Sequence, residues 1–131
     1  MVQGTRGLKV EISTYLEVQI DKLCNEDRRI VFSLIAELQR DGFDRLPGLL
    51  KPSNSVNKDQ HDWLERVSLA NQYNLWHYHI GIPRYDKDKP RGRWTSSKVI
   101  HLIPEDGKVT LVSIDDHPPF NLPNISILRS L

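Results

Sequence analysis

The chain has 131 residues, with 18 Lys and Arg against 17 Asp and Glu, so its formal net charge at pH 7 is +1. This length predicts one domain spanning residues 1–131, and hydrophobic (38%) and charged (27%) residues occur at the frequencies of ordinary globular proteins. The charge is too small for bulk electrostatics to indicate a nucleic-acid partner, and no apolar run reaches the roughly 18 residues of a membrane span.

The single cysteine, Cys24, cannot form an internal disulfide bond, which favours a reducing compartment. We expect its side chain to be buried as a small apolar residue. The N-terminus lacks the charged-then-apolar order of a signal peptide. The sequence therefore predicts a cytoplasmic protein that does not associate with membranes.

The first elements are a short strand and a short helix. Residues 1–7 contain two glycines and no hydrophobic pattern, which predicts a disordered end. Residues 8–12 alternate apolar and charged side chains, as a half-buried strand does. Thr14 followed by Glu17 fits a capping box, which predicts a helix over residues 15–23.

A second helix begins at Asn25 and ends at Gly42, with apolar residues at helical spacing: Val31, Leu34, Ile35 and Leu38. Residues 43–55 contain prolines and small polar residues and are interpreted as a loop. Residues 57–74 are ambiguous between a helix capped by Asn57 and a turn region.

The segment from Leu75 to Ile82 predicts a strand whose two faces differ in chemistry, because alternate side chains of a strand point to opposite faces. One face is apolar and suited to cover a core: Trp76, Tyr78, Ile80 and Ile82. His77 and His79 share the other face with Leu75. Two imidazoles side by side on a strand are the main functional clue.

The remaining chain predicts a hairpin. A polar loop of residues 84–93 follows the histidine strand, and residues 97–103 and 108–114 are two further strands joined by a Pro-Glu-Asp-Gly turn. The prolines after His117 end regular pairing, and residues 121–131 form a tail with apolar packing or partner contacts. The predicted fold class is α+β: a short N-terminal strand and two helices that cover one face of a small antiparallel sheet.

These elements resemble the RelE/ParE-like toxins of bacterial type II toxin–antitoxin systems, in particular the YafO-type mRNA interferases. The resemblance covers about residues 8–120. It rests on four short motifs in the right order: the Leu-Gln-Arg-Asp-Gly end of the second helix (residues 38–42), the His77-x-His79 strand, Arg93-x-Thr95-x-Ser97, and the Leu-Val-Ser-Ile strand (residues 111–114) that runs into His117.

The resemblance implies a β-α-α-β-β-β fold and an endoribonuclease that cuts mRNA on the ribosome and so inhibits translation and growth. The 2′-hydroxyl attacks the adjacent phosphate, and no metal or cofactor is needed. The implied partners are a cognate antitoxin, mRNA and the ribosome, in a homodimer or a toxin–antitoxin hetero-oligomer. Some relatives use a carboxylate base where Ser53 and Asn54 stand here, so a histidine must supply the base in this chain.

The residues themselves suit this chemistry, which needs a base, an acid and a cation near the phosphate. Histidine has an unperturbed pKa of about 6.5 and fits either proton-transfer role. The predicted catalytic residues are His79, His117, His77, Lys98 and His101. His101 is alternatively a half-buried, merely hydrogen-bonded residue, and Lys98 stands where the family often carries an RNA-contacting arginine.

The region from residue 84 to 98 has six basic and two acidic residues, a local excess of four positive charges. Aromatic residues among them offer stacking surfaces for single-stranded bases. The predicted RNA-binding residues are Arg84, Tyr85, Lys87, Lys89, Arg91, Arg93 and Trp94, together with Lys51 and Lys58, which match the family only loosely. The alternative is an ordinary solvated loop.

Two other functions are compatible with the pattern. His-x-His can bind zinc or iron with His101 or His117 and with Asp115 or Asp116, which would indicate a metal-dependent enzyme, although the nearby Lys and Arg residues would repel a cation. Alternatively, the chain is a non-nucleolytic ParE-like toxin or protein-binding module, whose action would not depend on the histidines.

Overall fold

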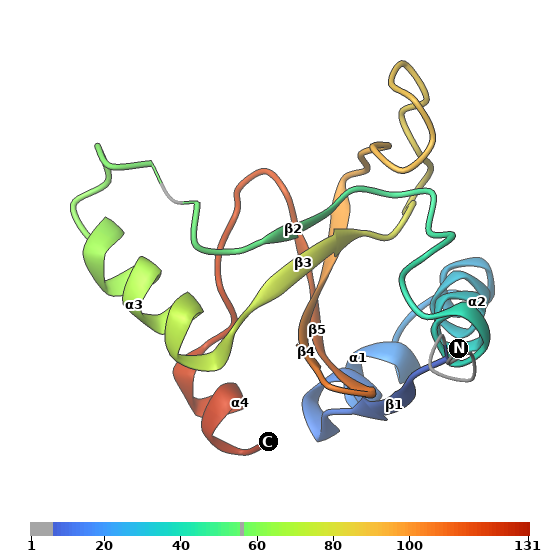
Figure 1. The fold of residues 1–131 in the computed structure, drawn as a ribbon, viewed down its shortest axis with the longest axis horizontal. Helices are drawn as coiled ribbons and strands as arrows, with labels where there is room; N and C mark the ends of the chain where they lie inside the picture. The colour runs from blue at the N-terminus through green and yellow to red at the C-terminus, as the bar shows by residue number, and fades with distance from the viewer. Residues whose placement is uncertain (1–6, 56) are drawn as a thin grey trace.

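The structure is a computed structural model that describes residues 7–55 and 57–131, and its architecture is α+β, as predicted. The predicted disorder of residues 1–7 lies, apart from Gly7, outside the described residues. The elements follow in the order β1 (Lys9–Ile12), α1 (Thr14–Asp21), α2 (Asn25–Asp41), β2 (Leu50–Pro52), α3 (Trp63–Tyr73), β3 (Trp76–His79), β4 (Lys98–Glu105), β5 (Lys108–Asp116) and α4 (Ile125–Arg129) (Figure 1).

In the described part of the chain, the strands form one five-stranded sheet with the order β1-β5-β4-β3-β2. β1 runs parallel to β5, with Lys9 opposite Lys108, and the other neighbours are antiparallel. The predicted antiparallel arrangement of the last three strands is therefore confirmed. β2 was not expected, because residues 43–55 were interpreted as a loop.

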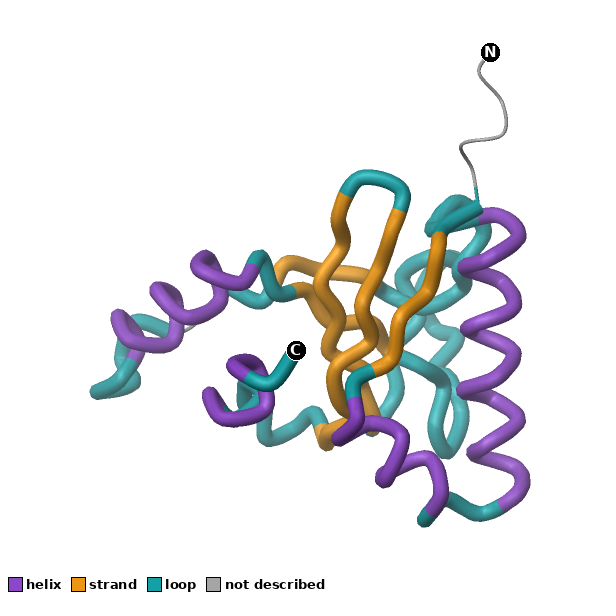
Figure 2. Tube along the Cα trace, turned by 90° about the horizontal axis from the view of Figure 1, so that it is seen from below, coloured by secondary structure: helices purple, strands orange, loops and turns teal. Residues whose placement is uncertain are grey.

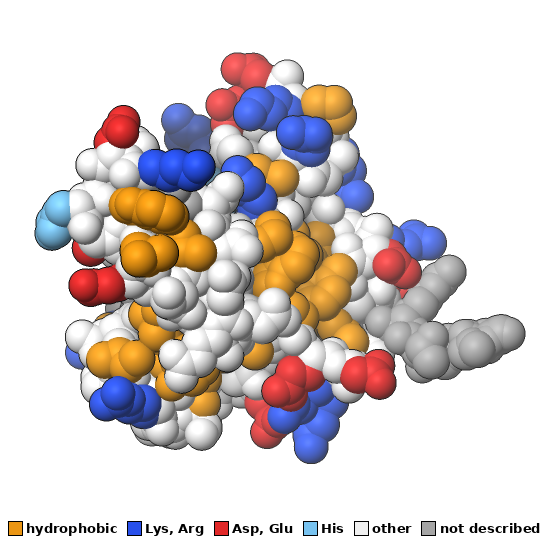
Figure 3. All heavy atoms as spheres, turned by 60° about the vertical axis from the view of Figure 1, so that its left-hand side comes forward, with side chains coloured by type: hydrophobic (Ala, Val, Ile, Leu, Met, Phe, Trp, Pro, Cys, Tyr) orange, Lys and Arg blue, Asp and Glu red, His pale blue; other side chains and the backbone are white. Residues whose placement is uncertain are grey.

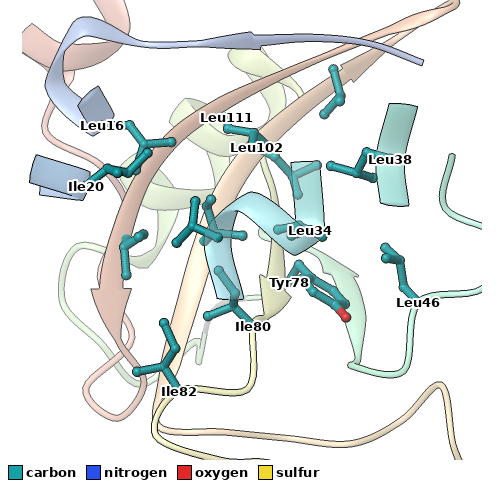
Figure 4. Close-up of a cluster of buried hydrophobic side chains, with 14 residues drawn as sticks. Leu16, Ile20, Leu34, Leu38, Leu46, Tyr78, Ile80, Ile82, Leu102 and Leu111 are labelled. Atoms are coloured by element: carbon teal, nitrogen blue, oxygen red, sulfur yellow. The ribbon is translucent and has the colours of Figure 1, made fainter. Parts of the chain in front are cut away.

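Helices α1 and α2 cover one face of the sheet, where the larger hydrophobic core lies (Figures 2 and 4). Leu16 of α1 and Leu38 of α2 are fully buried there against sheet residues such as Leu111. Helix α1 begins one residue earlier than predicted. Ser13, not Thr14, is the N-cap, since its hydroxyl accepts a hydrogen bond from the Leu16 amide at 2.9 Å and donates one to the Val112 carbonyl at 2.6 Å.

Helix α2 ends at Gly42 as predicted, with a φ of 64° that favours glycine. The helix begins at Asn25, as predicted; its N-cap is Cys24, whose side chain makes no capping hydrogen bond. The expectation that Cys24 is buried is wrong, because a residue at the exposed start of the helix faces solvent.

The second face of the sheet is partly covered by α3 and α4, whereas the sequence predicted helices on one face only (Figure 2). Ala70 of α3 and Leu128 of α4 pack with Leu75 and Val112 in a smaller core. The N-cap of α3 is Asp62 and not Asn57. The tail forms the short helix α4. Its five residues are too few to show a helical pattern in the sequence.

Strand β3 has the two-faced pattern that the sequence predicts, although the strand itself is limited to four residues. Tyr78 and Ile80 enter the core beneath α2 (Figure 4), whereas His77 and His79 point to the opposite face. The β4–β5 hairpin is also confirmed, and its turn contains Gly107 with a φ of 73°. No helix among the described residues is both long and apolar enough to cross a membrane.

Candidate active site

Three histidines meet on the second face of the sheet, the face that α3 and α4 partly cover. His77 and His79 come from β3, and His117 is the first residue after β5. The ring centroids lie 6.2 Å apart for His77 and His79, 5.7 Å for His77 and His117, and 5.3 Å for His79 and His117. One ring nitrogen from each histidine lies within 4.8 Å of the other two. The strand pattern thus brings the predicted catalytic histidines His77, His79 and His117 together.

The His79 ring is held by the backbone of Ser96. Its Nδ1 lies 3.0 Å from the Ser96 amide nitrogen and 3.0 Å from the Ser96 carbonyl oxygen. In one tautomer Nδ1 accepts from the amide, and in the other Nδ1–H donates to the carbonyl. In either tautomer the contacts with Ser96 involve Nδ1, and Nε2 stays available to groups in the cleft.

The His77 ring is held by Ser53, whose hydroxyl lies 2.9 Å from Nδ1. Both residues are buried. A hydroxyl donates or accepts, so this contact also accommodates both tautomers. β2 places Ser53 here, since its Lys51 pairs with His77 across the sheet and the Ser53 amide donates to the Leu75 carbonyl.

A chain of hydroxyl groups supports β3 from the opposite face. The Gly48 amide donates to the Tyr78 hydroxyl at 3.0 Å, which donates to the Tyr85 hydroxyl at 2.8 Å, which in turn donates to the His79 carbonyl at 2.9 Å. Burial raises the pKa of both tyrosines. Tyr85 was predicted to stack on RNA. Its hydroxyl has a structural role, because it links the Tyr78 hydroxyl to the His79 carbonyl.

The imidazoles line a cleft of about 570 Å³. Phe120 lies over them, with its ring centroid 4.5 Å from that of His77 and 5.0 Å from that of His117. Two basic residues, Lys51 of β2 and Arg66 of α3, also line this cleft. Arg66 donates to Asp62 and to the Phe120 carbonyl, whereas Lys51 has no ion-pair partner among the described residues.

Burial lowers the pKa of all three histidines. For His77 it is lowered to about 3, with further contributions from neighbouring histidines and Lys51. Burial also lowers the pKa of His79, but the hydrogen bond with Ser96 acts in the opposite direction. For His117 the causes are burial, then the Lys51 charge and His101. The cluster is therefore uncharged near neutral pH in the free protein.

A second pocket of about 520 Å³ adjoins the first. Arg84 and Lys87 line it, and it shares Thr95, Ser96 and His117 with the imidazole cleft. Lys87 lies over the Trp94 ring, with Nζ 4.9 Å from the centroid. Lys and Arg side chains gather in the upper part of the face shown in Figure 3, with acidic side chains among them.

Several predicted residues lie apart from the cleft. His101 is completely buried beneath Phe120, and Lys98 pairs with Asp116 at 2.5 Å. Arg91 lines a pocket beside α2, on the opposite face. Lys58, Lys89 and Arg93 are exposed and line neither pocket of the site.

The two ring nitrogens of His101 have no hydrogen-bond partner among the described residues. Its Nε2 lies 3.2 Å from Asp115 Oδ2, but without hydrogen-bond geometry. Because it is sealed from solvent, His101 cannot reach a substrate in this conformation. Its expected half-buried position is corrected to full burial.

Sequence reasoning missed four residues that shape the site: Phe120, Ser96, Ser53 and Arg66. Ser96 acts through its backbone, which carries no residue-specific signal. Arg66 reaches the cleft and Ser53 reaches the His77 ring only because α3 and β2 fold beside β3. Comparisons with protein-family models, with curated proteins and with solved structures find no match.

Proposed function

We propose that this chain is the toxin of a toxin–antitoxin pair and acts as a metal-independent endoribonuclease on mRNA. One observation carries the proposal: His117 belongs both to the imidazole cleft and to the adjoining pocket lined by Arg84 and Lys87. A phosphate placed at His117 would have proton-transfer groups on one side and cations for the neighbouring nucleotides on the other.

In the proposed reaction the ribose 2′-oxygen attacks phosphorus, and the bond from phosphorus to the 5′-oxygen breaks. The base removes the 2′-hydroxyl proton, and the acid protonates the leaving 5′-oxygen. The products are a 2′,3′-cyclic phosphate and a 5′-hydroxyl. In-line attack requires base and acid on opposite sides of phosphorus, and we assign these two positions to His79 and His117, whose ring centroids lie 5.3 Å apart.

We assign the base to His117 and the acid to His79. His117 is half-buried, is uncharged in the free protein and faces both pockets. His79 has the Ser96 carbonyl to accept a hydrogen bond from Nδ1–H, which stabilises its cationic form. A bound phosphate adds negative charge beside His79 and raises its pKa, which favours the protonated form that the acid needs.

The cations have separate roles in this proposal. Lys51 stabilises the charge that develops on the phosphorane, and Lys87 with Trp94 contacts an adjacent nucleotide. His77, whose pKa is lowered to about 3, remains neutral and positions the phosphate. Action on the ribosome and silencing by an antitoxin are what the resemblance to YafO-type toxins implies. They belong to the same proposal, as does the cytoplasmic location expected from the sequence.

The decisive experiment is mRNA cleavage by the EDTA-treated and dialysed protein, assayed both on free RNA and on mRNA bound to ribosomes, with identification of the RNA ends. We expect 2′,3′-cyclic phosphate ends, and a rate about 10²- to 10⁴-fold lower for His117→Ala or His79→Ala. His61→Ala is the matched control, because His61 is exposed and lies outside the imidazole cluster. Equal rates for His117→Ala and His61→Ala would exclude the assigned base.

Expression in bacteria tests the toxin role. Induction of the wild type should arrest growth and deplete intact mRNA, and His117→Ala should relieve both effects while remaining folded. Growth arrest by His117→Ala with intact mRNA would instead indicate a toxin that acts by binding a protein.

A further inference from the structure

The same three imidazoles form a geometry that the ribonuclease reaction does not require. We propose that His77, His79 and His117 bind one divalent transition-metal ion, best suited to Zn²⁺, and that this ion blocks RNA cleavage. The binding site stands on geometry alone, whereas the inhibition rests on the proposed function.

The first argument is the spacing of the donors. One nitrogen from each ring lies within 4.8 Å of the others. Zn–N bonds of about 2.0–2.1 Å in a tetrahedral site place nitrogens about 3.4 Å apart. His77 and His79 are fixed on β3, but His117 follows the end of β5 and is only half-buried. Side-chain movements that bring these nitrogens from within 4.8 Å to about 3.4 Å of one another would complete the site.

The second argument is the support behind the rings. Metal-binding histidines usually donate their other N–H to a carbonyl, carboxylate or hydroxyl, which fixes the ring and its tautomer. His79 Nδ1 has the Ser96 carbonyl at 3.0 Å, and His77 Nδ1 has the Ser53 hydroxyl at 2.9 Å. Both contacts are compatible with the tautomer whose Nε2 lone pair is available to a metal.

The third argument concerns the fourth coordination position of the metal ion. Within the described chain, the nearby carboxylates are engaged elsewhere: Asp116 pairs with Lys98, and Asp115 accepts from Ser113. The cluster thus offers three neutral nitrogens and leaves one position for water. Imidazole sets of this kind suit zinc and its neighbours in the first transition row, and not Mg²⁺ or Ca²⁺, which prefer oxygen ligands.

The surrounding cations set the strength of binding. Arg66 is neutralised by Asp62, its partner at 2.9 Å. Lys51 has no such partner among the described residues and lines the same cleft, so it repels a metal ion. The residue that would stabilise a bound phosphate is therefore the residue that weakens the metal site. Removal of Lys51 should strengthen Zn²⁺ binding and weaken RNA cleavage.

Inhibition follows from occupancy of the ring nitrogens. A nitrogen bound to Zn²⁺ cannot accept a proton from the 2′-hydroxyl or deliver one to the 5′-oxygen. The metal and the reaction therefore exclude each other at His79 and His117.

The binding test titrates ZnSO₄ into EDTA-treated and dialysed protein, in competition with a chromophoric zinc chelator. We expect saturation at one ion per chain, affinity weaker by on the order of 100-fold in His117→Ala, and affinity weaker by about 10-fold in Ser53→Ala. His61→Ala should match the wild type, and Lys51→Met should bind more tightly. Circular dichroism verifies that each variant is folded. Absence of saturable binding, or wild-type affinity in His117→Ala, overturns the site.

The second test adds ZnSO₄ to the RNA-cleavage assay. Cleavage should stop at one equivalent of Zn²⁺ and return with EDTA. Cleavage that continues at saturating Zn²⁺ overturns the inhibition. Stoichiometric Zn²⁺ binding by a protein that never cuts RNA overturns the proposed function and supports the site. Cleavage that requires Zn²⁺ overturns the metal-independent mechanism and likewise supports the site.

Discussion

The Nδ1 atom of His79 lies at the same distance, 3.0 Å, from the amide nitrogen and from the carbonyl oxygen of Ser96. A single peptide segment therefore satisfies this ring in either tautomer and in its cationic form. Such a partner suits a residue that changes its protonation state during a reaction. The position of Ser96 is in turn fixed by its own hydroxyl, which accepts from the Gly81 amide and donates to the Lys98 carbonyl.

Ser96→Ala should loosen this segment. It removes two hydrogen bonds and leaves the Gly81 amide without that acceptor, so we expect the free energy of unfolding to fall by about 1–3 kcal/mol. The rate of RNA cleavage should fall as well, because the His79 ring loses its fixed partner. Urea unfolding and the cleavage assay measure the two effects. Ser97→Ala is the control, since Ser97 is the exposed neighbour, and an equal loss of stability in both variants would contradict the role of the Ser96 hydroxyl.

Tyr85→Phe tests the support behind β3. The change deletes the hydroxyl that accepts from Tyr78 and donates to the His79 carbonyl. We expect a loss of about 1–3 kcal/mol in the free energy of unfolding, because Tyr78 loses its acceptor and the His79 carbonyl loses a donor. Tyr15→Phe, at a position 45% exposed, should cost almost nothing. If Tyr85 acts only by stacking on RNA, stability will remain unchanged.

His101→Leu should leave stability unchanged or increase it by up to about 2 kcal/mol at pH 7. The His101 ring is 0% exposed, and its nitrogens have no hydrogen-bond partner among the described residues, which is a cost that an apolar side chain removes. RNA cleavage should persist, because this ring does not line the cleft. Loss of cleavage in a stable His101→Leu protein would return His101 to the catalytic residues.

Acid should destabilise the metal-free protein between pH 6.5 and about 4.5. Burial lowers the folded-state pKa of His77 to about 3, and lowers those of His79 and His117, below the unfolded value of about 6.5. The unfolded chain therefore binds more protons in this range. The contribution of these histidines to the free energy of unfolding is fully present above pH 6.5 and decreases as the pH falls.

For His77 the loss continues down to its folded-state pKa, with a slope of at most about 1.4 kcal/mol per pH unit. Urea unfolding in EDTA at several pH values measures the slope, and His77→Asn should reduce it. Carboxyl groups begin to bind protons at the acidic end of this window, so the difference in slope between the wild type and His77→Asn isolates the imidazole contribution. A flat profile would show that the imidazoles are not buried as neutral groups.

The sequence predicted those features that depend on local rules. The alternation of residues 75–82 correctly separated Tyr78 from His79, because a strand has only two faces. Gly42 and Gly107 were correctly placed where φ is positive. The α+β class and the closing hairpin followed from these signals.

The features that the sequence did not predict depend on contacts between residues that are far apart in the chain. β2 has three residues and exists because it pairs with β3, and Phe120 covers the histidines only once the chain has turned after β5. Arg91 was grouped with the other basic loop residues, but the loop directs it to the side of α2. Charge counts along a loop do not reveal which face each side chain takes.

The parallel pairing of β1 with β5 has a consequence for the order of events during synthesis. Lys9 lies opposite Lys108, and the Ser13 hydroxyl donates to the Val112 carbonyl across 99 positions of sequence. β1 therefore has no partner strand in the sheet until β5 has been translated. His117 directly follows β5. The cluster of His77, His79 and His117 can therefore form only after both β5 and His117 have been translated. Under the proposed function, a nascent chain that ends before His117 lacks the assigned base.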